Sequence, residues 1–495
     1  MSRKGILLIL DGYGEGKPGP YNAVINAKTP FLDRIKAKSH SLLKTDGEAV
    51  GIFEGELGGS EVGHTTIGAG RIVPSTAKAI HDDMLADKLK DNKVLVDAFD
   101  FLQKNGGNLH LWGLCSDKNI HSDINTAIML ASLASKHAKN VFFHFITDGR
   151  DTGSKDSEKY LKMLVEGTKS LKNFHIISVA GRGYPMDREN NMDRIELALK
   201  YMFDGTSGEI EEKDILSYIK SQYAKGVNDQ FVLPMHVKVD EDAHLTKNDV
   251  FLVFNFREDR VRQMASEIKK FPCRLVTMSS VGNVESEVMY PAKKVEMTLS
   301  EHLSNEYKTQ VKISETTKYA HVTYFLNGGE EKPFLGEDRV HVPTIKVEDF
   351  ASTPKMRAKG ITKATKKAIK TGYDAIIVNY SNPDMIGHTG NYKAVVKSLE
   401  YLDKCVKKVV KKALKNDYFV LITADHGNCE CMRLPDGSPH MAHTLNLVEC
   451  VVVDKVEHKM KKYGGLKDVA PTFLDLMEVK KNPKFEGKSL IGVDR

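Results

Sequence analysis

Residues 6–11 read ILLILD, a run of five apolar residues that ends at a carboxylate, Asp11. Short runs that are apolar at every position are typical of strands buried on both faces of a parallel sheet. Similar runs recur along the chain, and most precede helical patterns; they are 109–114, 141–146, 175–180, 250–256, 375–380 and 418–423. This alternation predicts an α/β fold whose mainly parallel sheet is covered by helices on both faces.

Polar residues stand close behind these predicted strands. Asp11 follows the first run, Asp384 comes after 375–380, and Asp425 and His426 come after 418–423. Because ligands of open α/β sheets bind at the carboxyl ends of the strands, these side chains predict one shared site, or two sites that face each other.

The order of charged residues along the chain predicts an inserted domain. Candidate metal ligands lie toward both ends, whereas a group of arginines lies between them: Arg150, Arg182, Arg188, Arg257, Arg260 and Arg262. We therefore expect one domain built from residues 1–75 and 298–495, and a second, 76–297, that carries the anion-binding charge. At 495 residues the chain exceeds the size at which a single core stops growing, which favours this division.

Composition argues against several classes of function. The net charge of +6 is small for this length, and the lysines of 404–415 recur at helical spacing, as on a solvated helix face, so we expect no nucleic-acid partner. Six dispersed cysteines do not form a disulfide framework and fit a reducing compartment. The apolar run 6–10 is too short for a secretory signal, and no stretch approaches a membrane span, so we expect a cytoplasmic protein without a membrane partner.

Three short patterns carry potential metal ligands. Asp384 and His388 are four residues apart, one helical turn, although such a pair is more often a surface ion pair. Asp425 and His426 are adjacent; on a strand they would point opposite ways and serve two ions about 4 Å apart, while a helix-capping Asp beside an incidental His is the alternative. His443, the second of two nearby histidines, is the favoured further ligand.

Residues 58–64, GGSEVGH, place Ser60 among glycines that let the backbone approach a ligand closely. Taken alone, this serine is more simply a helix cap. The nucleophile elbow of the α/β-hydrolases is excluded, because Val62 stands where that motif requires glycine. Coordination to a metal would activate the serine without a histidine base.

Two segments, 147–151 (TDGRD) and 255–260 (NFREDR), pair arginines with acids directly after strands. The planar guanidinium matches phosphate and carboxylate oxygens two at a time, so these arginines suit a substrate that bears both groups. Structural salt bridges are the alternative interpretation.

Seven segments together resemble the cofactor-independent phosphoglycerate mutases, in that family's order over roughly residues 5–490. They are 10–14, 59–64, 147–151, 255–257, 318–323, 379–390 and 424–428. The resemblance implies an alkaline-phosphatase-like α/β domain with a mainly parallel sheet, interrupted by an inserted α/β substrate-binding domain. It also implies two manganese ions and no requirement for 2,3-bisphosphoglycerate, and we expect a monomer.

The resemblance also implies roles for individual residues. Ser60 would be the phosphorylated nucleophile, Asp151 the proton carrier for the hydroxyls of the substrate, and Lys318 a further catalytic residue. One metal would be held by Asp384, His388 and His443, and the other by Asp11, Ser60, Asp425 and His426. Phosphoglycerate would be bound by His121, Arg150, Asp151, Arg182, Arg188, Arg257, Arg260 and Lys318.

The chain departs from the family pattern at two places. Gly59 stands where the family usually has asparagine, and Cys429 and Cys431 follow the Asp-His pair, where thiolates would bind a softer metal such as zinc. The expected activity is the interconversion of 3-phosphoglycerate and 2-phosphoglycerate by intramolecular transfer. A metal-dependent phosphatase or another phosphomutase with the same metal core is the alternative. A metal-bound regulatory protein without turnover is disfavoured, because every catalytic position is filled.

Overall fold

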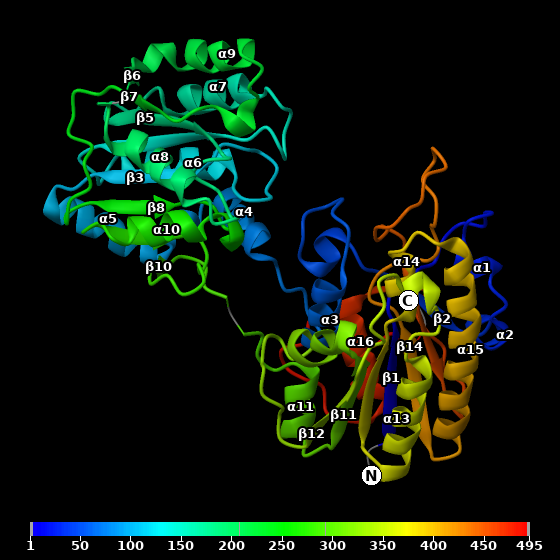
Figure 1. Ribbon diagram of the computed structural model, residues 1–495. Helices are drawn as coiled ribbons and strands as arrows, with labels where there is room; N and C mark the ends of the chain where they lie inside the picture. The colour runs from blue at the N-terminus through cyan, green and yellow to red at the C-terminus, as the bar shows by residue number, and fades with distance from the viewer. Residues whose placement is uncertain (1–2, 207, 293, 493–495) are drawn as a thin grey trace. The chain divides into compact units, whose positions relative to one another are not determined.

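The computed structural model describes residues 3–206, 208–292 and 294–492. The chain forms two compact units, which we call unit 1 (Met1–Ser75 with Lys293–Arg495) and unit 2 (Thr76–Ala292). Each unit is built around its own sheet (Figure 1).

Unit 1 contains a mixed sheet. Its strands are β1 (Lys4–Leu10), β2 (His40–Lys44), β11 (Gln310–Glu315), β12 (Glu337–Val342), β13 (Ala375–Tyr380), β14 (Tyr418–Thr423), β15 (Val448–Val453) and β16 (Tyr463–Gly465). They lie in the order β12-β11-β13-β1-β14-β15-β2-β16. From β12 to β14 all neighbours are parallel, whereas β15 runs antiparallel to both β14 and β2.

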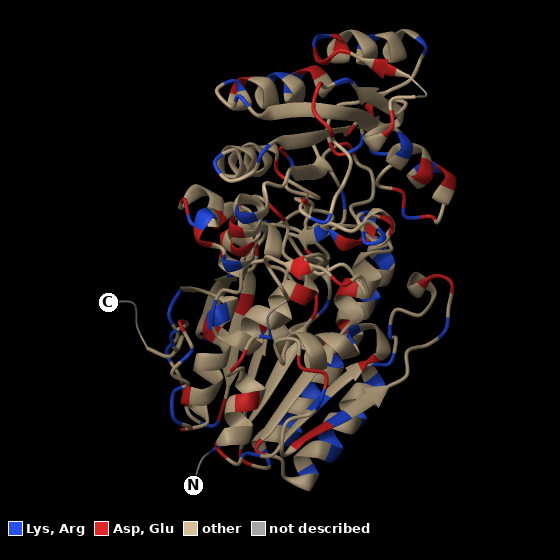
Figure 2. Ribbon diagram, turned by 90° about the vertical axis from the view of Figure 1, so that its left-hand side faces the viewer, with Lys and Arg blue, Asp and Glu red and all other residues tan. Residues whose placement is uncertain are grey.

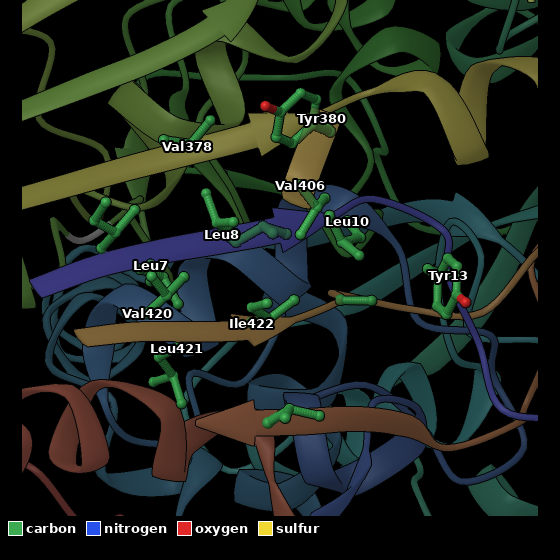
Figure 3. Close-up of a cluster of buried hydrophobic side chains, with 14 of the residues drawn as sticks. Leu7, Leu8, Leu10, Tyr13, Val378, Tyr380, Val406, Val420, Leu421 and Ile422 are labelled. Atoms are coloured by element: carbon green, nitrogen blue, oxygen red, sulfur yellow. The ribbon is translucent and has the colours of Figure 1, made fainter. Parts of the chain in front are cut away.

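Strand β1 lies in the middle of this sheet, which explains its uninterrupted apolar sequence. Leu7 pairs with Ile377 of β13 on one side and with Leu421 of β14 on the other. Figure 3 shows side chains of β1, β13 and β14 meeting in the core, where Val406 of a covering helix joins them. Because both faces of β1 are buried, the strand needs apolar residues at every position rather than at alternate ones.

Helices cover both faces of the sheet of unit 1. Figure 1 shows α13 (Ala358–Thr371) and α15 (Tyr392–Leu414) along one face, and α3 (Ser60–Ala69), α11 (Leu299–Asn305) and α16 (Val469–Leu476) grouped on the other. The remaining α-helices among the described residues of this unit are α1 (Ala23–Asn26), α2 (Pro30–Lys36), α12 (Thr316–Ala320) and α14 (Asn382–Gly387).

Unit 2 contains a second, mostly parallel sheet. Its strands are β3 (Leu109–Leu114), β4 (Val141–Thr147), β5 (Phe174–Gly181), β6 (Glu209–Ile210), β7 (Met235–Val237), β8 (Val250–Val253), β9 (Arg274–Thr277) and β10 (Glu287–Val288). The order is β10-β9-β8-β3-β4-β5-β7-β6, and only the β5–β7 pair is antiparallel among the described neighbours.

Two hydrophobic clusters flank the sheet of unit 2. The larger cluster takes residues from α5 (Lys93–Asn105), α6 (Ile124–Ala134), α7 (Ser157–Thr168) and α9 (Ile215–Ala224). The other takes residues from α8 (Met192–Phe203) and α10 (Arg262–Ile268), and α4 (Thr76–Leu85) begins the unit. A sheet with helices on both faces is the architecture that the alternating pattern predicts.

The seven predicted strands are present, and one prediction was too long. The run 250–256 forms a strand only over Val250–Val253. The ladder ends because the side chain of Asn255 accepts the backbone N–H of Leu114 (2.9 Å), a donor that a continuing strand would pair with its own backbone.

The charged surface agrees with the composition. In α15 the lysines at 404, 407, 408 and 411 are exposed, and the valines beside them are buried, as the helical spacing predicts. Figure 2 shows basic and acidic residues interspersed along helices and loops. Among the described residues, no helix is both long and apolar enough to span a membrane.

Candidate functional site

Ser60 lies at the start of α3, and its side chain does not cap the helix. Gly59, in extended backbone, occupies the cap position without a capping hydrogen bond. Ser60 Oγ instead lies 3.2 Å from Asp11 Oδ1 and 2.9 Å from His426 Nε2, and it accepts a hydrogen bond from the ammonium of Lys318. The hydroxyl is therefore directed into a cluster of charged side chains, and the helix-cap interpretation is wrong.

The first group of potential ligands consists of Asp11, Asp425 and His426. All three are fully buried, and one ligand atom from each lies within 4.8 Å of the others. Asp425 and His426 follow the end of β14 rather than lying in it, so the alternation of a strand does not apply to them. Both face the same centre, and the prediction that the two neighbours point opposite ways was wrong.

The second group consists of Asp384 in α14, His388 at the end of that helix, and His443. The Nε2 atoms of the two histidines lie 3.2 Å apart and 3.1 and 3.4 Å from Asp384 Oδ1. Their Nδ1 atoms donate to backbone carbonyls, that of His388 to Met441 (2.6 Å) and that of His443 to Gly58 (2.8 Å). Each ring, once it gives up its Nε2 proton, therefore presents an Nε2 lone pair to the same point, the arrangement of metal-binding histidines.

Both groups fit divalent cations. Asp425 Oδ2 is buried and accepts no hydrogen bond from the described residues, so it has an unused lone pair. Burial, followed by the charge of Asp425, raises the pKa of Asp11. Burial works in the same direction on Asp384, but hydrogen bonds from His388 and His443 outweigh it and hold the pKa of Asp384 well below its usual value. Carboxylates and imidazoles in such sets suit manganese, zinc or related ions.

Lys318 connects the two groups. Its Nζ lies 2.8 Å from Asp11 Oδ1 and 2.6 Å from Asp384 Oδ2. Burial alone would lower the pKa of Lys318, but the charges of Asp11 and then Asp384 raise it above its ordinary value. The backbone of Lys318 (φ −124°, ψ 15°) departs from helical geometry within α12. The ammonium is thus held beside Ser60 as a cation.

Three polar residues that sequence reasoning did not assign support these ligands. Asn379, in β13, donates to Asp11 Oδ2 (2.7 Å) and lies 3.1 Å from Nε2 of His64. His64 Nδ1 in turn lies 2.8 Å from the carbonyl of Ser60. Asn428 donates to Asp384 Oδ1 (3.2 Å). An asparagine within the apolar run 375–380 was the available signal, because a polar residue on a buried strand needs a specific partner.

The two cysteines after the Asp-His pair belong to neither group. Cys429 is buried and its Sγ donates to the carbonyl of Pro383 (3.0 Å), while burial raises the pKa of the Cys429 thiol well above its usual value. Cys431 Sγ is 3.6 Å from the carbonyl of Arg433. From the sequence, these thiolates were considered as ligands of a softer metal. Among the described residues, neither cysteine is part of a group of potential metal ligands.

In unit 2, three of the predicted substrate-binding residues are in direct contact. Arg182 Nη2 donates to His121 Nε2 (2.8 Å), and Arg182 Nη1 binds both Asp151 and Asp148. Asp151 Oδ2 lies 3.4 Å from His121 Nε2. Arg182 is only 3% exposed, so its charge is compensated by the carboxylates of Asp148 and Asp151 rather than by water.

The other predicted arginines lie around this contact. Arg188 and Arg257 both bind Asp259, each at 3.0 Å, and Arg260 donates to the carbonyl of Met186 (3.1 Å). Burial, followed by the charges of Arg188, Arg182 and Arg150, lowers the pKa of Arg260. These guanidinium groups are thus close enough to affect one another, as expected of a cluster that binds an anion.

Comparison with known proteins agrees with this geometry. The sequence matches the Metalloenzyme superfamily over residues 3–481. The 2,3-bisphosphoglycerate-independent phosphoglycerate mutase of Listeria welshimeri is 39% identical and is covered over 98% of both chains; that of Yersinia pseudotuberculosis is 37% identical over 99% of this chain and 98% of its own. The crystal structure of Leishmania mexicana phosphoglycerate mutase at low cobalt concentration has a TM-score of 0.61 at 27% identity, covering 100% of this chain and 98% of that one.

These matches extend over nearly the whole chain and include both units. Together with the two ligand groups they support dependence on divalent metal, and the predicted fold class is confirmed. The chain belongs to the family of 2,3-bisphosphoglycerate-independent phosphoglycerate mutases.

Proposed function

We propose that the chain interconverts 3-phosphoglycerate and 2-phosphoglycerate through a phosphorylated Ser60. The observation that carries the proposal is the position of Ser60 Oγ, within hydrogen-bonding distance of Asp11, His426 and the ammonium of Lys318. A hydroxyl held among metal-type ligands and a lysine is suited to accept a phosphoryl group, because positioning and charge neutralisation are most of what that transfer requires.

The reaction then consists of two transfers in opposite directions. In the first, Ser60 Oγ loses its proton to solvent and forms a P–O bond, the ester P–O bond to the substrate breaks, and the released glycerate oxygen takes a proton. In the second, the other hydroxyl of glycerate loses its proton and attacks the phosphoserine; a new ester P–O bond forms, the Ser60 Oγ–P bond breaks, and Ser60 Oγ takes back a proton. We assign this proton exchange to Asp151, and the neutralisation of charge on the moving group to Lys318. Two bound divalent cations would lower the pKa of the serine and offset phosphoryl charge.

The ligand sets and the arginines define the remaining assignments. We assign one metal to Asp384, His388 and His443 and the other to Asp11, Ser60, Asp425 and His426. Manganese is the proposed ion, because it accepts both carboxylate and imidazole ligands. No 2,3-bisphosphoglycerate is required, since Ser60 itself holds the phosphoryl group between the two steps. The glycerate would be bound by His121, Arg150, Asp151, Arg182, Arg188, Arg257, Arg260 and Lys318.

We also assign a role to each of the two domains. Residues 1–75 and 298–495 form the metal-binding, phosphatase-like domain, and residues 76–297 the inserted substrate-binding domain. A monomeric state and a cytoplasmic location stay predictions from the sequence.

A metal-dependent phosphatase is the competing function, because the same metal core would serve with water as the acceptor. The deciding experiment supplies 3-phosphoglycerate and measures 2-phosphoglycerate against free phosphate. A second arm mixes unlabelled substrate with substrate labelled in both carbon skeleton and phosphoryl oxygen. A mutase that retains glycerate gives products in which the two labels stay together. Release of free phosphate as the main product would identify a phosphatase, and early scrambling of the labels would contradict intramolecular transfer.

A further inference from the structure

A buried carboxylate in unit 2, Asp148, has no role in the reaction described above. It comes directly after β4 and is 2% exposed. Its Oδ1 accepts the backbone N–H groups of Arg150 and Asp151, each at 3.1 Å, and the Nη1 of Arg182 at 2.6 Å. One oxygen therefore fixes both the loop that carries Asp151 and the guanidinium that contacts it.

The other terminal nitrogen of the Arg182 guanidinium, Nη2, determines the tautomer of His121. Arg182 Nη2 lies 2.8 Å from His121 Nε2. A guanidinium only donates hydrogen bonds, so Nε2 must carry a lone pair and the ring proton of the neutral imidazole must be on Nδ1. The tautomer of His121 is therefore imposed by its neighbour.

The Nδ1 of His121 is then a donor without an acceptor. The side chain is 4% exposed, and among the described residues nothing accepts a hydrogen bond from Nδ1. A buried N–H left without a partner is costly, which points to an acceptor supplied by a ligand.

We propose that Asp148 is a positioning residue that acts through Arg182 to hold His121 as a neutral Nδ1–H donor for an anionic oxygen of the substrate. The proposal rests on the proposed function, because the acceptor it names is a phosphate or carboxylate oxygen of phosphoglycerate. Asp148 itself does not touch the substrate.

The charges that face His121 agree with a neutral ring. Burial, and next the charge of Arg182, lower the pKa of His121 to about 4. Asp151 and Asp259 act in the opposite direction, and Arg257 adds to the effect of Arg182. These groups follow β4, β5 and β8, and the backbone of His121 accepts the N–H of Phe256 (2.8 Å), which fixes the segment that carries the ring.

The test compares Asp148→Asn with the matched control Asp156→Asn in the full-length protein. Asparagine at 148 keeps the side-chain size and an acceptor for the two loop N–H groups but removes one of the two carboxylate charges that bind Arg182. Asp156 is in the same stretch and accepts the N–H of Gly153 (2.8 Å) without contacting His121 or Arg182. Its substitution removes an equal charge and leaves the contacts from Asp148 through Arg182 to His121 intact.

The readouts are the ¹⁵N resonances of His121, assigned with His121→Gln, and the KM for 3-phosphoglycerate. In the wild type we expect a single Nδ1–H tautomer that stays neutral to about pH 5. In Asp148→Asn we expect a mixture of tautomers and a rise in KM of about tenfold, as for loss of a charge-assisted hydrogen bond. The control should change neither. Unchanged His121 resonances in Asp148→Asn, or the same change in Asp156→Asn, would overturn the proposal.

A third variant covers the case in which Asp148→Asn does not fold. Arg182→Lys keeps the positive charge but removes the fork that reaches two partners at once. The His121 tautomer should then be released in a folded protein, and a fixed tautomer in this variant contradicts the proposal. Conversion of 3-phosphoglycerate by the wild type is measured separately. A result that contradicts the role of Asp148 in positioning His121 is therefore distinguishable from failure of the proposed function.

Discussion

The rings of His426 and His443 are stacked, with centroids 3.7 Å apart and an angle of 25° between their planes. Each histidine belongs to a different ligand group, and His426 Nε2 lies 4.0 Å from Asp384 Oδ1 of the other group. The two groups therefore form one continuous cluster. Loss of a ligand from one group is expected to affect the metal bound by the other.

The first prediction concerns metal content. His443→Ala should lower bound manganese from about two ions per chain toward one, because a three-residue group loses a ligand. Activity should fall in parallel, and removal of all metal by a chelator should abolish it. Metal analysis and calorimetric titration measure the effect. His440→Ala is the control, since His440 pairs with the carbonyl of Cys431 (2.9 Å) and belongs to neither group.

The second prediction concerns the nucleophile. Ser60→Ala should reduce formation of 2-phosphoglycerate by more than about a thousandfold, as is typical for loss of a covalent nucleophile. The fold should be retained, because Gly59 rather than Ser60 occupies the cap position of α3. The assay is paired with circular dichroism and with mass spectrometry for phosphorylated Ser60. Near-normal turnover in the variant would contradict the serine mechanism.

The third prediction is a loss of activity on mild acidification. The hydrogen bond to Asp384 raises the pKa of His388, and for His443 the same carboxylate outweighs burial, which acts in the other direction. Both rings must be neutral to bind metal, so protons compete at a higher pH than for an ordinary histidine, at about tenfold in affinity per pH unit for each proton displaced.

Excess manganese should move this acidic limb to lower pH, and an unmoved limb would mean that another group titrates. In protein stripped of metal by a chelator, the stability of the fold should depend on pH in the opposite direction to the activity. A raised histidine pKa stabilises the fold below the ordinary value and loses that contribution as pH rises through the raised one, so stability should fall over this window. Urea unfolding in chelator measures it.

The fourth prediction concerns Glu315, a fully buried carboxyl at the end of β11. Burial raises its pKa to about 7, although it accepts the N–H of Arg357 (2.9 Å). The folded chain therefore keeps a proton that the unfolded chain loses, so stability should fall as pH rises from about 4.5 to about 7, by on the order of 3 kcal/mol at most.

Glu315→Gln removes this titration, so its stability relative to the wild type should increase across the same range. Urea unfolding at pH 5 and pH 8 measures the difference. Glu348→Gln, a substitution of an exposed glutamate, is the matched control. A difference between Glu315→Gln and wild type that does not vary with pH would contradict the assignment.

The fifth prediction concerns retention of glycerate. Arg257→Ala should raise the ratio of free phosphate to 2-phosphoglycerate several-fold, because glycerate that escapes leaves water as the acceptor. Arg257 is about half exposed and is held by Asp259, so its loss should leave the fold intact. Product analysis by phosphorus NMR gives the ratio. Arg274→Ala, which removes an ion pair with Glu287 and lies outside the group of arginines predicted to bind the anion, should leave it unchanged.

Much of this molecule is predictable from local pattern. Runs apolar at every position identify the central strands, and the residues behind them identify the candidate ligands, because the carboxyl ends of parallel strands converge. The geometry at the strand ends is not predictable in this way. Asp425 and His426 face one centre because the chain has left β14 before reaching them, and Asn255 ends β8 with a side-chain contact to a strand distant in sequence.

The supporting residues were harder still to predict. The contacts of Asn379 with Asp11 and with His64 join segments that lie more than 300 residues apart in sequence, so local pattern does not predict them. His64 contacts Ser60 within one turn of the same helix, but nothing in the local sequence marks it as a supporting residue. Similarly, the sharing of Asp259 by Arg188 and Arg257 is a property of loops, which periodicity does not describe.

The central place of β1 has a consequence for how the protein is made. Its partners β13 and β14 begin at Ala375 and Tyr418, so at 5–20 residues per second β1 waits on the order of half a minute for them to leave the ribosome. The residues of unit 2 are contiguous and are all translated before β13 begins. A nascent chain stalled before Tyr418 would expose ILLIL and lack Asp425, His426 and His443. Such a fragment should recruit chaperones or aggregate, and it should have no catalytic activity.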